Sequence, residues 1–292
     1  MAEIFDVAVI GGGPAGLSAV LTGRNRNKKI VFFEHLDFSQ KLQKAHAIDN
    51  YLGLPNIAGK ELMEQFVNHV LSHDPVLVKE KVTNVFLTGS TFTLVTGQVT
   101  YEAKTVILAT GVMATALFRG EKELLGRGVS YCATCDGMFY RGKDVAVISY
   151  TPSGEHEANF LAEICQSVTY LPQYRGDYGD LSPGIIVTQD RPQAIIGEKQ
   201  VSELATNGEN IKTSGVFIIR QSDPVENIIP ELELDGAVIK VDRQQATNIA
   251  GIFAAGDCTG RPWQIAKATG EGLVAVLSAI SYLDEHSKQK NT

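Results

Sequence analysis

The amino-acid sequence predicts an α/β fold made of two Rossmann-like three-layer (ββα/αβ) domains of the dinucleotide-binding type, with the second inserted in the first. A length of 292 residues suits two domains of ordinary size. Near the N-terminus a strand pattern, a glycine turn and a helix pattern follow one another, and a second strand–turn–helix start begins at residue 144. The last part of the chain, from residue 251, is expected to rejoin the first domain.

The first domain is predicted to begin with a βαβ unit. Residues 5–10 form an apolar strand pattern, residues 15–24 place apolar side chains on one helix face, and residues 29–34 form a second buried strand. Later patterns predict a helix over 61–71, short strands within 82–101, a strand over 105–109 and a C-terminal helix around 272–283.

The second domain is predicted to follow a charged, glycine-rich stretch over residues 119–128, where the chain leaves the first domain. A proline-containing stretch over residues 223–230 indicates the return. Between them the patterns predict strands over 144–148, 168–171 and 216–219 and a helix over 157–164. We therefore assign residues 1–115 and 234–292 to the first domain and residues 116–233 to the inserted domain.

Composition is that of a soluble globular protein, with 44% apolar and 20% charged residues. The net charge of −7 argues against a nucleic-acid partner, which requires a basic surface. No apolar run approaches the roughly 18 residues of a membrane span, and the acidic N-terminus shows no targeting pattern. Four cysteines do not make a secreted disulfide framework. We therefore expect a cytoplasmic protein that binds neither nucleic acid nor a membrane.

Residues 11–16 (GGGPAG) fit the pattern G-x-G-x-x-G where the first strand ends and the first helix begins. Gly11 suits the tight turn, Gly13 lets the backbone approach a pyrophosphate, and Gly16 lets helix and strand approach each other. The helix N-terminus offers N–H groups to a phosphate, and Glu34 can bind an adenosine ribose. A glycine turn without a ligand is the alternative. The expected dinucleotide-binding residues are Gly11, Gly13, Pro14, Ala15, Gly16 and Glu34.

Residues 247–257 (TNIAGIFAAGD) resemble the second FAD motif of flavoproteins with two dinucleotide-binding domains. In that motif a short strand delivers Gly256 and Asp257, so that the Asp257 carboxylate can accept a hydrogen bond from a ribityl hydroxyl. An ordinary strand and turn is the alternative. Because the two motifs lie at opposite ends of the chain, as in those flavoproteins, we expect FAD rather than NAD at the first glycine turn.

Cys132 and Cys135 form a C-x-x-C pair, which in a cytosolic protein is usually redox-active or half of a zinc site. Zinc requires four ligands, whereas Cys165 and Cys258 stand alone and are expected to be packing thiols, so we expect no metal. In the redox interpretation the short spacing lets a disulfide open and close, and one thiolate attacks. Asp136 either moves the proton or caps a turn.

Residues 128–137 (GVSYCATCDG) and 140–143 (YRGK) resemble the low-molecular-weight bacterial thioredoxin reductases. The similarity spans nearly the whole chain and includes residues 50–53 (NYLG), 109–111 (ATG) and 268–272 (ATGEG). The resemblance implies that FAD and a redox-active disulfide lie on different domains of one chain. It also implies a homodimer.

The resemblance further implies roles for single residues. Cys135 would be the sulfur next to the flavin, Cys132 the thiol that attacks thioredoxin, and Asp136 the acid and base. Trp263 replaces the arginine usual before Gln264, which alters the edge of the flavin site. Further contacts with FAD are implied for Asn50, Ala109, Thr110, Gly111, Gln264 and Ile265.

The inserted domain departs from reductases that use NADPH. Residues 149–158 (SYTPSGEHEA) stand where those enzymes carry G-x-G-x-x-A, and Glu155 and Glu157 add negative charge where a phosphate would bind. Paired arginines that would bind a 2′-phosphate are absent from residues 171–177 (LPQYRGD). The pattern resembles the ferredoxin-dependent flavin thioredoxin reductases. In those enzymes two one-electron transfers through FAD reduce the disulfide, which then reduces thioredoxin.

Basic residues flank the C-x-x-C and either meet an acidic ferredoxin or thioredoxin or form a solvated face. They are Arg119, Lys122, Arg127, Arg141 and Lys143. Three other functions stay open: an NAD(P)H-dependent thioredoxin reductase with a diverged nucleotide site, an oxygen-dependent dithiol oxidase, and a flavin redox sensor without turnover. The Ala133-Thr134 spacer and Asp136 favour a reductase over the oxidase. We therefore expect an FAD enzyme that takes electrons from ferredoxin and reduces thioredoxin.

Overall fold

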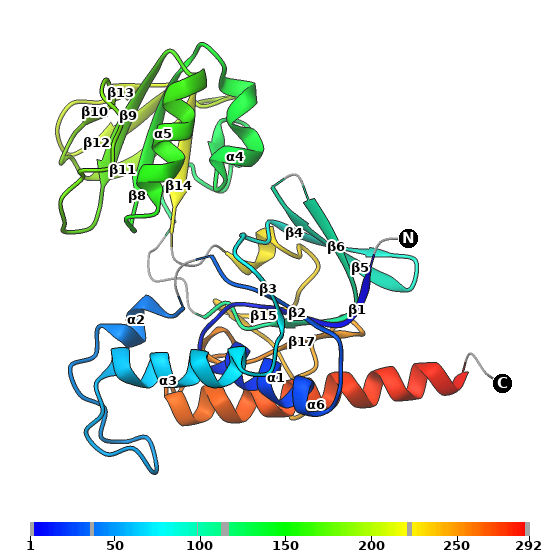
Figure 1. The fold of residues 1–292 in the computed structure, drawn as a ribbon. Coiled ribbons are helices and arrows are strands. Elements are labelled where there is room, and N and C mark those ends of the chain that lie inside the picture. Colours follow the sequence, from blue (N-terminus) through cyan, green and yellow to red (C-terminus); the bar gives the residue numbers. More distant parts are fainter. Residues whose placement is uncertain (1–2, 36–37, 98, 112–116, 221–223, 290–292) are drawn as a thin grey trace. The chain divides into compact units, whose positions relative to one another are not determined.

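A computed structural model describes residues 3–35, 38–97, 99–111, 117–220 and 224–289. The chain divides into two compact units (Figure 1): unit 1 comprises Met1–Val112 and Pro224–Thr292, and unit 2 comprises Met113–Asp223. Unit 2 is therefore inserted in the sequence of unit 1. The expected boundary between residues 115 and 116 lies outside the described residues.

The second expected boundary, between residues 233 and 234, is corrected by the packing of the residues before it. Ile228, Ile229 and Leu232 are buried in the core of unit 1. The Ile228 carbonyl also accepts a hydrogen bond from the Val85 N–H at 2.9 Å. The chain thus belongs to unit 1 from Pro224 onward. The prolines and acids of this stretch suggested a linker and concealed its buried isoleucines.

Unit 1 is built from an N-terminal and a C-terminal group of elements. The N-terminal group contains β1 (Ile4–Ile10), α1 (Pro14–Asn25), β2 (Ile30–Phe33), α2 (Gln40–Gln43), α3 (Gly59–Leu71), β3 (Val76–Val78), β4 (Asn84–Thr88), β5 (Thr91–Thr96) and β6 (Val99–Leu108). The C-terminal group contains η2 (Val225–Asn227), β15 (Leu234–Asp235), β16 (Val238–Ile239), β17 (Ile252–Ala254), η3 (Asp257–Thr259) and α6 (Ile265–Gln289). Both groups contribute strands to one sheet.

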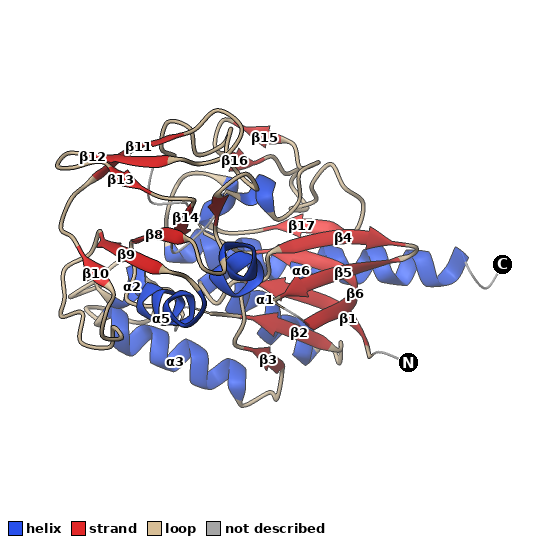
Figure 2. Cartoon of the chain, turned by 90° about the horizontal axis from the view of Figure 1, so that it is seen from above, coloured by secondary structure: helices blue, strands red, loops and turns tan. Residues whose placement is uncertain are grey.

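That sheet has the strand order β3-β2-β1-β6-β5-β4, and β17 also pairs with β6 (Figure 2). β1 pairs in parallel with β2 and β6, and β17 pairs in parallel with β6, so their carboxyl ends meet at one edge. Val7 and Val9 face the layer of α1, α3 and α6, whereas Phe5 and Ala8 face the opposite core. Because both faces of β1 are buried, its sequence reads as a continuous apolar run.

Unit 2 repeats this three-layer plan. Its elements are β7 (Val129–Ser130), α4 (Ala133–Asp136), η1 (Gly137–Tyr140), β8 (Asp144–Ser149), α5 (Gly154–Ile164), β9 (Ser167–Pro172), β10 (Ile186–Val187), β11 (Pro192–Ile196), β12 (Glu203–Thr206), β13 (Ile211–Lys212) and β14 (Gly215–Ile219). A parallel sheet of order β10-β9-β8-β14-β7 forms its centre. Val145 and Val147 pack toward α5, and Ala146 and Ile148 pack toward the sheet β11-β12-β13. The predicted fold class is confirmed.

A buried ion pair joins the first and last parts of unit 2. Arg220 and Glu121 are 2% and 0% exposed at their side chains, and the Arg220 Nη2 atom donates to Glu121 Oε2 at 2.8 Å. The Tyr131 hydroxyl and the Phe118 N–H also donate to Glu121, each at 2.8 Å. A buried charge is costly unless it is paired and hydrogen-bonded, and these donors meet that requirement.

Candidate active site

The glycine turn between β1 and α1 is shaped by close backbone contacts. Gly11 has φ +113°, and a Cβ added there would lie 2.3 Å from the Ala109 carbonyl oxygen. A Cβ added at Gly16 would lie 1.9 Å from the Gly11 oxygen. By contrast, a Cβ added at Gly13 would meet nothing within 4 Å. Gly11 and Gly16 therefore serve the packing of the turn, whereas Gly13 leaves open space in front of α1.

The first turn of α1 presents hydrogen-bond donors to this space. Gly13 caps the helix without a side-chain acceptor, Pro14 has no N–H, and the first turn carries no acid. Among the described residues, the N–H groups of Ala15 and Gly16 meet no acceptor. Such an N-terminus favours a phosphate through its N–H groups and its partial positive charge. The residues present here fit the pyrophosphate of a dinucleotide.

Glu34 lies directly after β2, beside the same turn. Its side chain is buried, and its Oε2 atom accepts a hydrogen bond from the Gly12 N–H at 2.6 Å. This contact fixes the carboxylate at the end of the strand, where it suits an adenosine ribose. A pocket beside it is lined by Glu34, His35, Phe38, Leu77 and Lys79.

The other residues expected at the dinucleotide lie at the same edge of the sheet. Residues 109–111 follow β6, and Gly256 and Asp257 follow β17. The Ala255 N–H donates to the Leu108 oxygen at 2.9 Å. A Cβ added at Gly256 would lie 2.8 Å from the Ala15 Cβ, so this turn packs against the first turn of α1. The two glycine motifs are therefore brought together although they lie far apart in the sequence.

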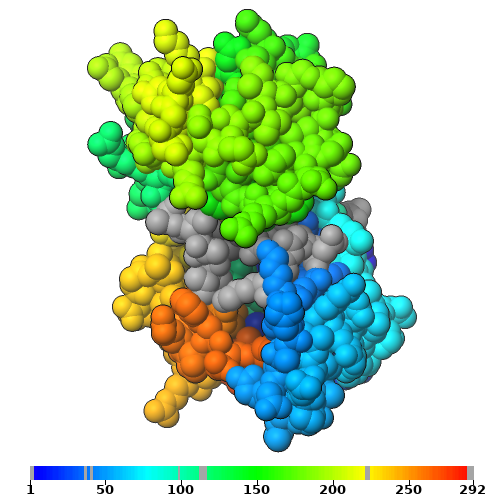
Figure 3. Space-filling model, turned by 90° about the vertical axis from the view of Figure 1, so that its left-hand side faces the viewer, coloured from blue at the N-terminus to red at the C-terminus, as the bar shows by residue number. Residues whose placement is uncertain are grey.

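Asn50 and Gln264 are also brought together, since the Asn50 Nδ2 atom donates to the Gln264 Oε1 atom at 2.8 Å. Ile265 begins α6 and packs against a small core that includes Ile48 and Leu62. Figure 3 shows the blue N-terminal and orange C-terminal segments of unit 1 against each other. The loop before α6 is thereby tied to the loop that contains Asn50.

Lys267 and Glu271, to which the sequence assigned no role of their own, hold the Asp257 turn. The Lys267 Nζ atom donates to the Gly256 and Gly260 carbonyls, each at 2.8 Å, and lies 3.0 Å from Glu271. Glu271 in turn accepts the Gly256 N–H at 2.9 Å. Their i,i+4 spacing on one helix was the sequence signal that could have indicated the pair.

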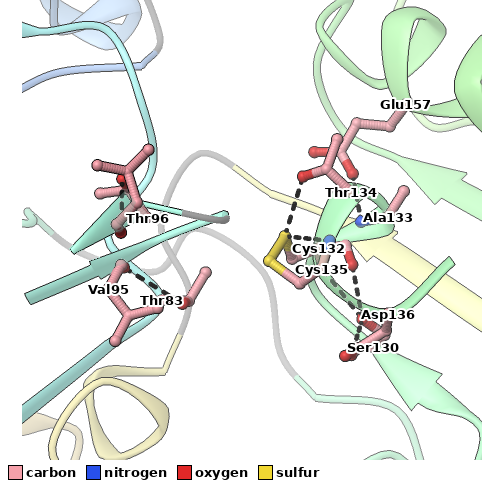
Figure 4. Close-up of a disulfide and its surroundings, with 11 residues drawn as sticks. Thr83, Val95, Thr96, Ser130, Cys132, Ala133, Thr134, Cys135, Asp136 and Glu157 are labelled. Carbon is pink, nitrogen blue, oxygen red and sulfur yellow. Dashed lines mark hydrogen bonds between the residues drawn. A yellow bond between two sulfur atoms is a disulfide. The ribbon is translucent and has the colours of Figure 1, made fainter. Parts of the chain in front are cut away.

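In unit 2, Cys132 and Cys135 form a disulfide with a Cα–Cα distance of 5.4 Å (Figure 4). Cys132 lies at the N-cap of α4, and its Sγ atom accepts the Cys135 N–H at 3.2 Å. The Thr134 Oγ1 atom lies 3.4 Å from the same sulfur. Hydrogen bonds to a sulfur stabilise its thiolate form. The surroundings of Cys132 therefore suit an attacking thiolate after the disulfide opens.

Two further side chains, Ser130 and Glu157, support the disulfide loop, a role that the sequence did not indicate. The Ser130 Oγ atom donates to Asp136 Oδ2 at 2.7 Å, and it accepts the Cys132 N–H at 3.1 Å. The Glu157 carboxylate, on α5, accepts the Ala133 N–H at 2.6 Å (Figure 4). Asp136 thus lies in the disulfide loop, held by a neighbouring strand.

The N-terminus of α5 differs from that of α1 because its own loop uses the N–H groups of its first two residues. The Gly154 N–H donates to the Thr151 oxygen at 3.2 Å, and the Glu155 N–H donates to the Pro152 oxygen at 3.0 Å. A Cβ added at Gly154 would lie 2.1 Å from the Ser149 Oγ atom, so side chains already fill this turn. Two of the donors of this turn and the space beside Gly154 are thus already used within the protein.

The Glu155 side chain, at the same end of α5, is held by hydrogen bonds inside unit 2. It is buried, and it accepts hydrogen bonds from the Tyr174 hydroxyl at 2.5 Å and the Asp180 N–H at 3.3 Å. Burial and the Glu155 carboxylate raise the pKa of Tyr174, so its hydroxyl stays protonated and donates. Tyr174 follows β9, where a nucleotide-binding domain would hold the 2′-phosphate. Glu155 and Glu157 therefore act through internal hydrogen bonds, which the sequence did not indicate.

The two remaining cysteines lie away from the disulfide in sequence and environment. Cys258 is buried behind Asp257, and Cys165 is half-buried at the end of α5. Burial raises the pKa of each thiol to about 11, so both are protonated at neutral pH. Within the described ranges, no group of three or more His, Cys, Asp or Glu side chains is arranged to hold a metal. In the same described part of the chain, no helix is long and apolar enough to cross a membrane.

The five basic residues that flank the C-x-x-C in the sequence are all exposed on unit 2. Lys143 lies over the Tyr140 ring, with its Nζ atom 5.6 Å from the ring centroid. On unit 1, the Arg261 Cζ atom lies 4.6 Å from the centroid of the Trp263 ring. Trp263, which replaces the usual arginine, therefore packs against the arginine two residues before it.

Comparison with known proteins agrees with this geometry. The family model for pyridine nucleotide-disulphide oxidoreductases matches residues 5–174 and 184–272. A thioredoxin reductase of Mycolicibacterium smegmatis is 33% identical over 97% of this chain and 97% of its own length. A bifunctional thioredoxin reductase/thioredoxin of Mycobacterium leprae is 35% identical over 98% of this chain and 68% of its own length.

Two solved structures are also similar. A ferredoxin-flavin thioredoxin reductase from Clostridium acetobutylicum is 44% identical with a TM-score of 0.94, covering 98% of this chain and 99% of that one. A thioredoxin reductase from Gloeobacter violaceus is 28% identical with a TM-score of 0.86, covering 97% of this chain and 95% of that one. The chain therefore belongs to the pyridine nucleotide-disulphide oxidoreductase family, as a flavoenzyme of the thioredoxin reductase type.

Proposed function

We propose that this protein binds FAD in unit 1 and reduces the disulfide of thioredoxin through Cys132 and Cys135, with ferredoxin rather than NADPH as the electron donor. The choice of donor is carried by one observation: the N-terminus of α1 is open to a phosphate, whereas that of α5 is closed by its own loop and by Glu155.

Unit 1 offers the residues that would hold FAD. The N–H groups of Ala15 and Gly16 would bind the pyrophosphate, Glu34 the adenosine ribose, and Asp257 the ribityl chain. Asn50 and Gln264 form a hydrogen-bonded pair that would border the flavin ring. When bound, FAD supplies a carrier that accepts electrons singly and passes them on as a pair.

The chemistry at the disulfide can be written with the side chains of unit 2. In the reduced form the Cys132 thiolate attacks one sulfur of the thioredoxin disulfide; that disulfide breaks and a mixed disulfide forms. Asp136 then takes the proton of the Cys135 thiol, and the Cys135 thiolate attacks the Cys132 sulfur. The second thioredoxin sulfur leaves and takes up a proton. Two electrons pass to thioredoxin, and the Cys132–Cys135 disulfide is restored.

The donor proposal draws on the closed α5 and on the similarity to a structure named ferredoxin-flavin thioredoxin reductase. The exposed basic residues around the disulfide loop would suit acidic protein partners through electrostatic attraction. We also propose a cytoplasmic homodimer, as the resemblance implies.

The test is thioredoxin turnover under anaerobic conditions with reduced ferredoxin, NADPH or NADH as donor. We expect turnover with reduced ferredoxin and none with either nucleotide. Cys132→Ser should abolish thioredoxin reduction and leave the reduction of the flavin intact. Turnover with NADPH would refute the donor, and surviving turnover in the variant would refute the thiol assignment. Oxygen uptake with small dithiols, without any thioredoxin reduction, would instead indicate the dithiol oxidase.

A further inference from the structure

Ser130 occupies a rigid and buried position beside the disulfide loop. It is 3% exposed, and its strand β7 pairs with β14 in the register Ser130–Phe217. A buried hydroxyl needs hydrogen-bond partners, since leaving it unsatisfied destabilises the fold. The hydrogen-bond partners of Ser130 therefore indicate the role of this buried polar side chain.

The hydrogen bonds of Ser130 connect both ends of the loop. Its Oγ atom lies 2.7 Å from Asp136 Oδ2 and 3.2 Å from the Cys132 carbonyl oxygen. A hydroxyl has one proton, and the shorter distance assigns that proton to the carboxylate. The same oxygen accepts the Cys132 N–H at 3.1 Å. Ser130 thus joins the backbone of the first cysteine to the carboxylate that follows the second.

We propose that Ser130 is a positioning residue that aims the Asp136 carboxylate at the Cys135 thiol during the second half of thiol–disulfide exchange. This inference rests on the proposed function of Asp136 as the base. Ser130 acts by restricting the rotation of the carboxylate, and it touches neither thioredoxin nor the reacting sulfurs. Its loss should therefore slow the resolution of the mixed disulfide and spare its formation.

A matched hydrogen bond in the same unit supplies the control. The Ser167 Oγ atom donates to Asp144 Oδ1 at 2.6 Å, at the edge of β8 and β9. Ser167→Ala therefore removes a serine–aspartate hydrogen bond of similar length from unit 2 without touching the disulfide loop.

The experiment uses holoenzyme reduced with dithionite under anaerobic conditions and mixed rapidly with oxidised thioredoxin. Quenching with acid and separating the mixed disulfide gives its rates of formation and resolution. For Ser130→Ala we expect resolution to slow about 10-fold, the effect of one orienting hydrogen bond, with formation unchanged. Ser130→Thr should restore resolution to within about 3-fold, and Ser167→Ala should leave both rates unchanged.

A double-mutant cycle with Asp136→Asn separates positioning from a general structural effect. In that background Ser130→Ala should change resolution less than about 2-fold, since the side chain that it positions is already altered. Equal slowing of both steps, or full additivity with Asp136→Asn, would overturn the proposal. If Ser130→Ala does not fold, Ser130→Thr and Ser130→Val give the same comparison, because the two side chains share a shape and differ in the hydroxyl.

The result also distinguishes this inference from the proposed function. If wild-type enzyme reduced with dithionite fails to reduce thioredoxin, the proposed function is wrong. If it succeeds and Ser130→Ala resolves the mixed disulfide at the wild-type rate, only the role of Ser130 is wrong.

Discussion

The helices α1 and α5 occupy equivalent places in the two units but differ in the chemistry of their N-termini. Each follows a parallel strand of its unit, β1 or β8, yet among the described residues the N–H groups of Ala15 and Gly16 in the first turn of α1 meet no acceptor. The N–H groups of Gly154 and Glu155, the first two of α5, are bonded to carbonyls of the preceding loop. Glu155 and Tyr174 then fill the space beyond. A shared fold therefore does not give a shared ligand, because the side chains of one turn decide what can bind.

The two helices also differ in the space around the glycine at their N-termini, Gly13 for α1 and Gly154 for α5. A Cβ added at Gly13 would meet nothing within 4 Å among the described residues, whereas one added at Gly154 would lie 2.1 Å from the Ser149 Oγ atom. Open space in front of a helix exposes donors and is useful to a ligand. Filled space beside Gly154 excludes a ligand there, and the first two donors of α5 bond to the preceding loop instead.

The largest expected effect follows from filling the space before α1 with Gly13→Val. Among the described residues an added Cβ meets nothing within 4 Å, so we expect the variant to fold. The added side chain would exclude the pyrophosphate from the N–H groups of Ala15 and Gly16. Two charge-assisted hydrogen bonds, worth about 1.5–3 kcal/mol each, would be lost, which lowers FAD affinity about 100- to 10,000-fold. Fluorescence titration of apoprotein with FAD measures the change.

The matched control replaces the N-cap of α5 by Ser153→Val. FAD affinity should remain that of the unaltered protein. Equal losses of FAD affinity in the two variants would contradict the difference between the two helices.

The second expected effect concerns the hydrogen bond between Tyr174 and Glu155 at the N-terminus of α5. Tyr174→Phe removes the hydroxyl that donates to the buried Glu155 carboxylate. We expect the free energy of unfolding to fall by about 1–3 kcal/mol, because a buried charged group loses a donor. Urea unfolding measures it, and the FAD content should not change.

Tyr178→Phe is the control for this variant, since its hydroxyl donates to the Tyr174 carbonyl at a longer 3.3 Å. Its cost should stay below about 1 kcal/mol. Unaltered stability of the Tyr174→Phe protein would contradict this role of the hydroxyl.

A smaller effect is expected from Lys267→Met in unit 1. The ammonium group donates to both ends of the Asp257 turn, at Gly256 and Gly260. Losing it loosens the turn that would bind the ribityl chain, and we expect FAD affinity to fall about 10-fold, which corresponds to roughly 1.4 kcal/mol. Lys240→Met removes a surface ion pair with Glu233 in the same unit and should leave the affinity unchanged. Identical titration curves for the two variants would argue against this role of Lys267.

The single thiols of the two units, Cys258 and Cys165, should be similarly unreactive at neutral pH. Cys258 in unit 1 and Cys165 in unit 2 both have a pKa raised to about 11 by burial. A raised pKa keeps a thiol protonated, so the thiolate that reacts is scarce at pH 7 and grows as the pH approaches 11. Alkylation of the reduced protein at neutral pH, followed by mass spectrometry, should label Cys132 and Cys135 first. Equally fast labelling of Cys165 would contradict its protonated state.

The sequence was sufficient where the chemistry lies in local patterns. The strand–glycine–helix start, the Gly256-Asp257 motif and the C-x-x-C each occupy a few neighbouring residues, and their elements lie where the patterns placed them. The missing glycines after β8 also indicated the altered turn before α5.

The partners of single side chains could not be predicted in this way. Arg220 forms an ion pair with Glu121, 99 residues earlier in the sequence. Glu155 accepts a hydrogen bond from Tyr174, which follows β9. Such contacts depend on tertiary packing, for which the sequence carries no periodic signal. The boundary at residue 224 was missed for a related reason, because Ile228 and Ile229 become buried only once the core of unit 1 has formed.

The most direct test of the difference between α1 and α5 is an anaerobic titration of the FAD-loaded protein, followed by the absorbance of the flavin. Reduced ferredoxin should bleach the flavin, and NADPH at millimolar concentration should leave the spectrum unchanged. Saturable bleaching by NADPH would contradict the account, because it would require a working nucleotide site where Glu155 and Tyr174 close the end of α5.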